Sequence, residues 1–405
     1  MSEQKMVRLR DLGVWSGGNT PSKARADFWS DGVIPWVSPK DMKVHELSSS
    51  EDLISETALQ EGRVSLLPAG AVLIVTRSGI LSHSLPVAVT KVPVTINQDI
   101  KALVPHKDVC PRYVAHALRG ASQRILKTCS KHGTTVASVE TAALLDFEIP
   151  LLPLDQQRKV VAEIEKQFSR LDEAVANLQR VKANLKRYKA SVLKAAVEGR
   201  LTEGNVDSFR RLRLGEIVEL NPRLPKNSLD DTSSVTFVPM AAVGADDGHL
   251  DVTAIRSYSE VRKGYTYFAD GDVLFAKVTP CMENGKIAIA KGLLGGIGFG
   301  STEFHVMRPR HDVDSRYVYC IVSSESFRKK AARHMTGAVG LRRVPTAFLE
   351  SVEVSVPPLD QQLLVVSEVD RQLTIIQEIE AEVDVNLQRS KVLRQATLAK
   401  AFLNR

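Results

Sequence analysis

The 405-residue sequence contains no continuous apolar stretch of the roughly 18 to 20 residues that a membrane-spanning helix needs. Its first residues, MSEQKMVRLRDLG, include no apolar segment of the kind found in secretory signals, so we expect neither a signal nor a membrane anchor. There are four cysteines, and none is spaced as Cys-x-x-Cys or grouped with histidines as zinc ligands are. We therefore expect reduced thiols, no metal site and a cytoplasmic protein.

Motifs of the common catalytic sites are also missing. The sequence has no G-x-x-x-x-G-K-[ST] phosphate loop, no G-x-S-x-G nucleophile turn and no H-E-x-x-H metal motif. The segment Asn221-Pro-Arg differs from the Asn-Pro-Pro-aromatic motif of adenine amino-methyltransferases. The glycines at 295–300 do not have G-x-G-x-x-G spacing, so we interpret them as a turn. We predict no catalytic residues in this chain.

The composition is that of a folded protein with a mild excess of positive charge. Apolar residues make up 43% and charged residues 25% of the chain, which excludes a largely disordered or collagen-like protein. At about 150 residues per domain, the length predicts two or three domains. Lysine and arginine number 54 against 47 acidic residues, a net charge of +7. This sign favours a polyanionic partner but is too small to identify one.

The chain consists of two copies of one plan. The segment LPLDQQRKVV at 152–161 returns as PPLDQQLLVV at 357–366, an offset of 205 residues, and the register continues without a gap for more than forty residues. Fainter matches lie upstream, such as Arg112-Tyr-Val114 with Arg316-Tyr-Val318. A period this long indicates a duplicated domain rather than a solenoid of short repeats.

Each copy has a globular part followed by a helical part. The globular parts contain short apolar runs, such as 71–75 and 272–276, separated by glycine- and proline-rich turn signals. This pattern predicts domains of the α/β (α+β) class built from short strands. We place the globular domains and the helical regions at the following residues: 1–152 and 206–357 for the domains, 153–201 and 358–405 for the helices.

The helical parts have the pattern of a coiled coil. From Asp155 to Gly199 the apolar residues recur at alternating steps of three and four, with no proline or glycine before the end. The two helices are expected to pack against each other, with Phe168, Leu171 and Val175 on one and Leu373 and Ile376 on the other burying the contact. The full set of predicted packing residues is Val161, Ile164, Phe168, Leu171, Val175, Leu178, Val366, Val369, Leu373 and Ile376.

Charge favours an antiparallel arrangement of these helices. Residues 180–200 carry seven basic side chains and one acid, whereas residues 368–384 carry six acids and one base. Antiparallel packing places these two segments side by side. Each ion pair contributes only a few tenths of a kcal/mol, but their sum selects the orientation. A duplicated chain with antiparallel helices acquires a pseudo-twofold axis.

Basic and polar loops after the short strands are the remaining candidates for binding. Arginine and lysine can fork onto guanine, asparagine onto adenine, and glutamate can accept from cytosine, while glycines let the backbone approach phosphate. For any one residue, an ordinary solvated hairpin loop is the competing interpretation. The candidates are Lys40, Arg77, Ser78, His83, Lys131, His132, Thr134 and Thr135 in the first half, and Lys277, Thr279, Glu283, Asn284, Lys286, Arg342 and Arg343 in the second.

Taken together, these features resemble the specificity subunit of type I restriction-modification systems. The resemblance covers essentially the whole chain. It is carried by Gly133-Thr-Thr-Val136, Ile149-Pro-Leu-Leu-Pro-Leu-Asp-Gln-Gln157, Ser191-Val-Leu-Lys-Ala-Ala196 and Val356-Pro-Pro-Leu-Asp-Gln-Gln362. The second copy departs at Gly337-Ala-Val-Gly-Leu-Arg-Arg343, which leaves the correspondence of that loop open.

The resemblance implies a protein with two target-recognition domains joined by two long antiparallel helices. Each domain would read one half of a bipartite site in double-stranded DNA. The helices would act as a spacer and dock two methyltransferase subunits, with motor or restriction subunits joining the full complex. The chain itself would be non-catalytic and bind no cofactor, because S-adenosylmethionine and ATP with magnesium would belong to the partner subunits.

Other interpretations remain open. A self-contained modification enzyme would need a cofactor pocket and the Asn-Pro-Pro-aromatic motif. A coiled-coil adaptor would need no basic loops, and a specificity module of another DNA-modification system would share them. Because the loop at 76–79 barely aligns with the longer stretch at 277–286, we also expect the two domains to read different bases.

Overall fold

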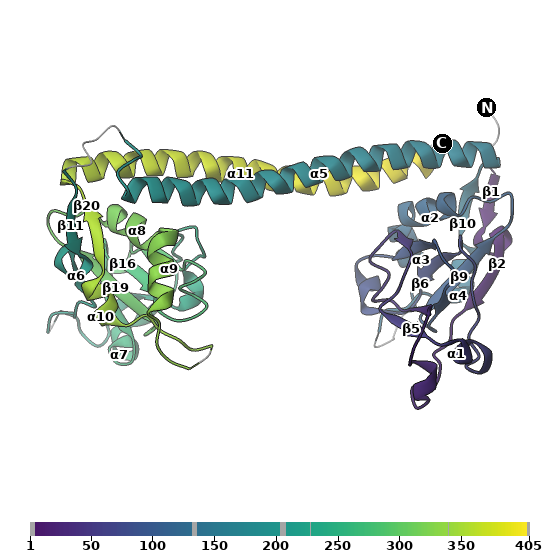
Figure 1. Ribbon diagram of the computed structural model, residues 1–405, viewed down its shortest axis with the longest axis horizontal. Helices are drawn as coiled ribbons and strands as arrows, with labels where there is room; N and C mark the ends of the chain where they lie inside the picture. The colour runs from purple at the N-terminus through teal and green to yellow at the C-terminus, as the bar shows by residue number, and fades with distance from the viewer. Residues whose placement is uncertain (1–4, 132–135, 203–207, 227, 339, 403–405) are drawn as a thin grey trace. The chain divides into compact units, whose positions relative to one another are not determined.

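The computed structural model describes residues 5–131, 136–202, 208–226, 228–338 and 340–402. Two compact units make up the chain, Met1–Leu178 with Val385–Arg405, and Gln179–Asp384. Two long helices, α5 (Leu154–Val197) and α11 (Leu359–Phe402), each contribute one half to either unit (Figure 1). The helices begin at Leu154 and Leu359, and each compact unit extends across the start of its helix.

In the first unit a five-stranded sheet forms the core. Its central strand β6 (Val72–Val75) is buried along its whole length, which fits its uninterrupted apolar sequence. The strand order is β2 (Gly13–Gly17), β9 (Ile100–Pro105), β6, β7 (Val87–Thr90) and β4 (Glu46–Leu47), antiparallel except for β4 with β7. A second sheet has the order β5 (Asp52–Ile54), β3 (Ile34–Val37) and β8 (Thr95–Ile96). Strand β1 (Lys5–Arg8) pairs with β10 (Glu148–Leu151) where the chain enters and leaves the domain.

Helix α2 (Pro111–Gly120) connects this sheet to the long helices. It begins with proline at its first position, where the missing N–H costs nothing. The ring of Tyr113 lies 5.1 Å from that of Phe402 in α11, and the ring of His116 lies 5.8 Å from that of Phe168 in α5. The remaining helices of the unit are α1 (Glu56–Glu61), α3 (Ser122–Cys129), α4 (Thr141–Asp146), and the 3-10 turns Leu9–Leu12, Ala26–Phe28 and Gly79–Ser82.

The second unit repeats this plan. Its sheets have the orders β12 (Val218–Leu220), β19 (Phe304–Pro309), β16 (Val273–Ala276), β17 (Ile287–Ile289), and β14 (Ile255–Ser257), β13 (Ser234–Val238), β18 (Ile297–Gly300), β15 (Thr266–Ala269). Strand β11 (Arg210–Arg213) pairs with β20 (Glu353–Val356) as β1 does with β10. The helices are α6 (Leu214–Ile217), α7 (Tyr258–Val261), α8 (Ser315–Ser323), α9 (Glu325–Arg333) and α10 (Thr346–Ser351), with 3-10 turns at Met240–Ala242 and Leu294–Gly296.

The glycine-rich run at 295–300 was expected to be a turn, and that interpretation is wrong for most of it. Gly295 and Gly296 do form a turn, with φ of 61° and 72°. The rest of the run is β18, which pairs with both β13 and β15. A Cβ at Gly298 would lie 2.2 Å from the ring of Phe268, so the glycine makes room for a buried aromatic ring rather than for a bend.

The repeated Asp-Gln-Gln segment joins each domain to its helix. The fully buried side chain of Gln157 accepts a hydrogen bond from the N–H of Cys110 at 2.7 Å and donates to the carbonyls of Asp108 and Leu152. In the second unit Gln362 makes the same three bonds, to Asp314, Asp312 and Pro357. Each glutamine thus ties the loop before α2 or α8 to the first turn of α5 or α11.

The two long helices pair antiparallel, as their charges predicted (Figure 1). In the first unit Arg394 forms an ion pair with Asp172. In the second unit the ammonium of Lys182 lies 2.7 Å from the carboxylate of Asp384, ten residues further along α5 and ten residues earlier in α11. The two helices therefore run in opposite directions, and each step of ten residues along α5 matches a step of ten residues back along α11.

This register changes the role of the predicted packing residues. Val161, Ile164 and Phe168 are buried in the core of the first domain together with the end of α11, and Leu171 is partly buried against it, while Val175 and Leu178 are half-buried. Val366 and Val369 are buried in the second core, with Leu373 partly buried against it, and Ile376 is buried as well. The expected pairing of Phe168, Leu171 and Val175 with Leu373 and Ile376 differs from the observed register. Arg394 of α11 lies over the ring of Phe168, and Gln372, next to Leu373, accepts from Tyr188 of α5. The start of each helix covers its own domain instead.

Candidate nucleic-acid interface

In the first unit three loops meet where β6 ends. The N–H groups of Thr76 and Arg77 both donate to the carbonyl of Asp99, at 2.8 and 3.2 Å. Arg77 forms a β-bridge with Ser138, whose carbonyl accepts from the N–H of Lys131 at 2.9 Å. The arrangement brings the exposed positions 77 and 131 into one small framework.

The other predicted residues of this half differ in their exposure and in the partners they already have. Ser78 belongs to the framework, because its N–H donates to the carbonyl of Ala137 at 3.1 Å. His83 is exposed at the end of the 3-10 turn after Arg77. Lys40 is exposed, but its ammonium lies 3.0 Å from Asp52 and 3.3 Å from Glu51, so its charge is already paired. His132, Thr134 and Thr135 lie outside the described residues.

Sequence reasoning missed the loop that holds the framework together. Asn97 is buried, and its side chain accepts from the N–H of Asp99 and donates to the carboxylate of Asp99, both at 3.1 Å. Gln98 between them is exposed. The signal was present as a polar Asn-Gln-Asp run between two buried strands, which is typical of a loop with an Asx turn.

The second unit has the same framework after β16. The N–H of Lys277 donates to the carbonyl of Glu303, the N–H of Val344 to that of Lys277, and the N–H of Thr279 to that of Arg342, at 2.9 to 3.0 Å. In the first unit the matching bonds run from Thr76 to Asp99, from Val139 to Thr76, and from Ser78 to Ala137. The departing loop around 337–343 therefore corresponds to the loop before Val139, which answers the question that the sequence left open.

Equivalent positions in the two frameworks carry different side chains. By these bonds Lys277 stands where the first unit has Thr76, and Val278 stands where it has Arg77. Arg342 and Arg343 replace Ala137 and Ser138. A common backbone scaffold thus presents one set of polar groups in the first unit and another in the second, which is what two different reading surfaces require.

Several predicted residues of the second half have internal partners. The ammonium of Lys286 donates to the carbonyls of Met240 and Val243, at 3.1 and 2.6 Å, so it faces the protein. The hydroxyl of Thr279 accepts from the N–H of Arg342 at 3.2 Å. Glu283 and Asn284 are exposed, and the carboxylate of Glu283 lies 3.7 Å from Arg342.

Asn221 serves the framework rather than any catalysis. It has a left-handed backbone, with φ of 51°, and its side chain accepts from the N–H of Val306 at 3.0 Å. Its amide also contacts Nδ1 of His305, at 3.3 Å, while Nε2 of His305 lies 2.8 Å from the carbonyl of Val344. Since a carbonyl only accepts, Nε2 carries the hydrogen. Burial lowers the pKa of His305, which keeps the ring neutral.

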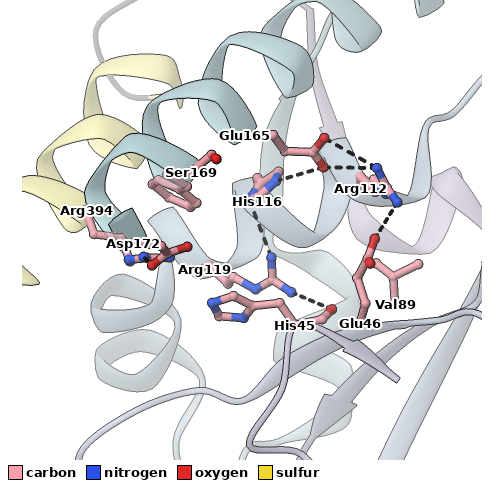
Figure 2. Close-up of a pocket in the computed structure, with 11 residues that line it drawn as sticks. His45, Glu46, Val89, Arg112, His116, Arg119, Glu165, Ser169, Asp172 and Arg394 are labelled. Atoms are coloured by element: carbon pink, nitrogen blue, oxygen red, sulfur yellow. Dashed lines mark hydrogen bonds and ion pairs between the residues drawn. The ribbon is translucent and has the colours of Figure 1, made fainter. Parts of the chain in front are cut away.

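A cleft of about 420 Å³ lies elsewhere in the first unit, where α2, the edge of the sheet and the long helices meet (Figure 2). Arg112 bridges Glu46 and Glu165, with 3.2 Å to the latter, and Arg119 donates to the carbonyls of Val87 and His45. None of the predicted DNA-binding residues lines this cleft. Its arginines already have carboxylate or carbonyl partners. We therefore interpret the cleft as a structural junction between the domain and the helices.

This junction should make the first unit sensitive to acid. Burial lowers the pKa of His116 to about 3, against about 6.5 in an unfolded chain. The folded state excludes a proton that the unfolded chain binds, so this contribution to stability is complete above pH 6.5 and is lost as the pH falls toward 3. We expect a loss of about 1.6 kcal/mol between pH 6.5 and 5.

Urea unfolding followed by tryptophan fluorescence will test this, because all three tryptophans are in the first unit. The control is His116→Cys, which copies Cys320 at the equivalent buried position of the second unit. That variant should lose the histidine part of the pH dependence. Equal pH slopes for the two proteins would contradict the assignment.

Two general properties complete the description of the site. In the part of the chain that the structure describes, no group of three or more histidine, cysteine, aspartate or glutamate residues is placed to hold a metal ion. Across the same residues, no helix is both long enough and apolar enough to cross a membrane. The four cysteines are free thiols.

Comparison with known sequences gives a consistent result. Residues 1–187 and 207–385 match the family described as Type I restriction modification DNA specificity domain. The specificity subunit of the type I restriction enzyme EcoR124I/EcoR124II from Escherichia coli is 40% identical over 173 residues, which cover 43% of this chain and 43% of that protein. The chain therefore aligns with less than half the length of that relative.

Solved structures share the fold over nearly the whole chain. A chain from a study of complex assembly and conformational transition in the type I R-M system has a TM-score of 0.75, covering 99% of this chain and 98% of its own, at 17% identity. The HsdS subunit from Thermoanaerobacter tengcongensis has a TM-score of 0.60, covering 98% and 96%, at 18% identity. At these identities the likeness concerns the fold.

Proposed function

Because the chain belongs to the type I restriction-modification DNA specificity family, we propose that it is a non-catalytic subunit that directs modification to a bipartite DNA site. Each globular domain, 1–152 and 206–357, reads one half of that site. The observation that carries the proposal is the duplicated loop framework, in which one set of backbone bonds presents different polar side chains in the two units.

The proposed reading surfaces use the exposed residues of each framework. In the first unit these are Arg77, Lys131 and Gln98, with Ser78 and His83 beside them. In the second unit they are the exposed Arg342 and Arg343 and the half-buried Lys277, with Glu283 and Asn284 beside them. Lys40 and Lys286 are weaker candidates, because acids or carbonyls already occupy their ammonium groups.

The helical regions, 153–201 and 358–405, are proposed to set the spacing of the half-sites and to dock two methyltransferase subunits. Motor or restriction subunits complete the assembly in systems that cleave DNA. On this proposal S-adenosylmethionine and ATP with magnesium bind to the partner subunits, and the complex acts on the chromosome in the cytoplasm. Relatives with specificity-subunit descriptions support this assignment, while the partners of this chain are part of the proposal.

The first expected result concerns Arg77. Replacing it with alanine should weaken binding of the assembled complex to its site by about 1–3 kcal/mol if the guanidinium forks onto a base, with relaxed specificity at one position. If it contacts phosphate, binding should weaken equally on all sequences and the salt slope should fall by about one. Gel-shift titrations at several salt concentrations separate these outcomes.

The matched control is Lys107→Ala. Lys107 is an exposed cation of the same domain, but it follows the far end of β9, whereas Asp99 precedes the near end. Its replacement should leave affinity and specificity unchanged. If Arg77→Ala and Lys107→Ala behave alike, the framework is not the reading surface. If the wild-type complex binds no DNA selectively, the adaptor interpretation replaces the proposed function.

A further inference from the structure

The ion pair between Glu303 and Arg343 stands out in the second framework. The carboxylate of Glu303 accepts from Nε of Arg343 at 2.9 Å and from Nη2 at 2.7 Å, so it grips one side of the guanidinium. The guanidinium side chain is 46% exposed, whereas the carboxylate side chain is 27% exposed. The carboxylate of Glu303 is thus more buried than the guanidinium of Arg343, which faces solvent.

The backbone that carries this arginine is fixed on two sides. Arg343 and Thr336 exchange both backbone hydrogen bonds, at 2.8 and 3.0 Å. The next residue, Val344, is buried, donates to the carbonyl of Lys277 at 2.9 Å and has its own carbonyl held by His305. A long side chain that starts from such a platform and is held again near its tip has lost most of its rotational freedom.

One edge of the guanidinium remains available. Nε and one hydrogen of Nη2 are used by Glu303. Among the described residues, the other hydrogen bond of this side chain runs from Nη1 to the carbonyl of Leu341 at 3.5 Å, the outer limit of a hydrogen bond. The end of the fork, formed by Nη1 and Nη2, carries the donors that match the O6 and N7 acceptors of guanine.

A second arginine–carboxylate pair in the same unit shows the contrast. Arg308 also makes a fork, to Asp272, at 2.7 and 2.8 Å. There the acid is completely buried and accepts a further bond from the N–H of Ala269, and the guanidinium lies over the ring of Tyr267. That pair is internal to the domain, whereas the pair at Arg343 presents its cation outward.

We propose that Glu303 is a positioning residue that holds Arg343 ready to fork onto a guanine in the major groove of the second half-site. The inference rests on the proposed function and deepens it, because it names a base and the residue pair that reads it. The described residues of the first framework contain no such pair, since Ser138 stands at the position of Arg343 and the Asp99 carboxylate is bonded to Asn97. A guanine read in this way is specific to the second half-site.

The test uses the chain assembled with its methyltransferase subunits and duplexes carrying its methylation motif. Each guanine of the second half-site is replaced in turn by 7-deazaguanine, which lacks the N7 acceptor. Wild-type binding should fall about 10- to 100-fold at one guanine only. Arg343→Met, which keeps most of the side-chain length but has no N–H donor, should be insensitive to that replacement.

Glu303→Gln should change the affinity for the specific site in opposite directions under the two possible roles of Glu303. A positioning role predicts that affinity for the specific site falls about 3- to 10-fold while binding to unrelated DNA stays equal or rises, because a negative charge is removed. A merely electrostatic role predicts that both affinities rise together, which would overturn the proposal. Glu303→Asp should restore part of the selectivity. Glu350→Gln, which changes an exposed acid on α10 of the same unit outside the reading surface, is the control and should leave this guanine's contribution unchanged.

The failure of this inference is distinguishable from failure of the proposed function. A second half-site without guanine, or one in which no 7-deazaguanine changes wild-type binding, would remove the inference and leave DNA reading intact. A complex that discriminates among no DNA sequences would remove both. Because the 7-deazaguanine scan uses the wild-type chain, a variant that fails to fold does not prevent the decision.

Discussion

Replacing Gln157 with leucine should lower the free energy of unfolding of the first unit by about 3–5 kcal/mol. Leucine has a similar volume, so the change removes hydrogen bonds rather than packing. It leaves the N–H of Cys110 and the carbonyls of Asp108 and Leu152 without the side-chain partner they have in a buried site. Unsatisfied buried groups of this kind cost about 1–3 kcal/mol each, before relaxation reduces the total.

The neighbouring residue supplies the control. Gln156 is exposed one position earlier on the same helix, and Gln156→Leu should change stability by less than about 0.5 kcal/mol. Urea unfolding followed by tryptophan fluorescence reports the first unit alone. Comparable stabilities for the two variants would show that the buried hydrogen bonds do not hold the domain to its helix. Gln362→Leu should act in the same way on the second unit, outside the reach of this probe.

A chimeric chain in which a second copy of residues 5–151 replaces residues 210–356 should direct methylation to a palindromic site. The two segments have the same length. In each, the first residue pairs with the last across two antiparallel strands, Lys5 with Leu151 and Arg210 with Val356, so the ends to be joined lie side by side in both. The long helix after each segment carries the same buried glutamine, Gln157 in one unit and Gln362 in the other, which bonds the domain to the helix. Two identical readers on antiparallel helices should read one half-site and its inverted repeat.

Methylome sequencing of a host that carries the chimera with its methyltransferase gene measures this directly. The reciprocal chimera, with residues 210–356 in both places, should yield the palindrome of the other half-site. The wild-type motif should have two different halves. A chimera that retains the wild-type motif would show that specificity resides outside these segments.

Much of the architecture could be predicted from the sequence because it depends on local patterns. Both long helices begin and end at the repeat offset, Leu154 with Leu359 and Val197 with Phe402. Their apolar spacing, their freedom from proline and glycine and their opposite charges are all readable along the chain. The fully buried Gln157 and Gln362 explain why the repeat is strongest at that element.

The direction of individual loop side chains could not be predicted in this way. Lys286 resembles any exposed loop lysine in the sequence, yet its ammonium faces two carbonyls more than forty residues earlier. Glu303 was missed because its partner Arg343 lies forty residues further on. Such contacts depend on how distant segments meet, and no local period records them. The glycines at 298 and 300 were misread for the same reason, since the ring of Phe268 fills the space beside Gly298 and the carbonyl of Val238 fills the space beside Gly300.

The return of α11 to the first unit has a consequence for biosynthesis. Leu398 and Phe402 are buried with the first domain, where the ring of Phe402 lies against Tyr113. A ribosome makes the first domain before the second, but it adds these two residues only after the second domain. The domain that is synthesised first is therefore completed only after the second, and its apolar surface under α11 stays uncovered while the second domain is being made.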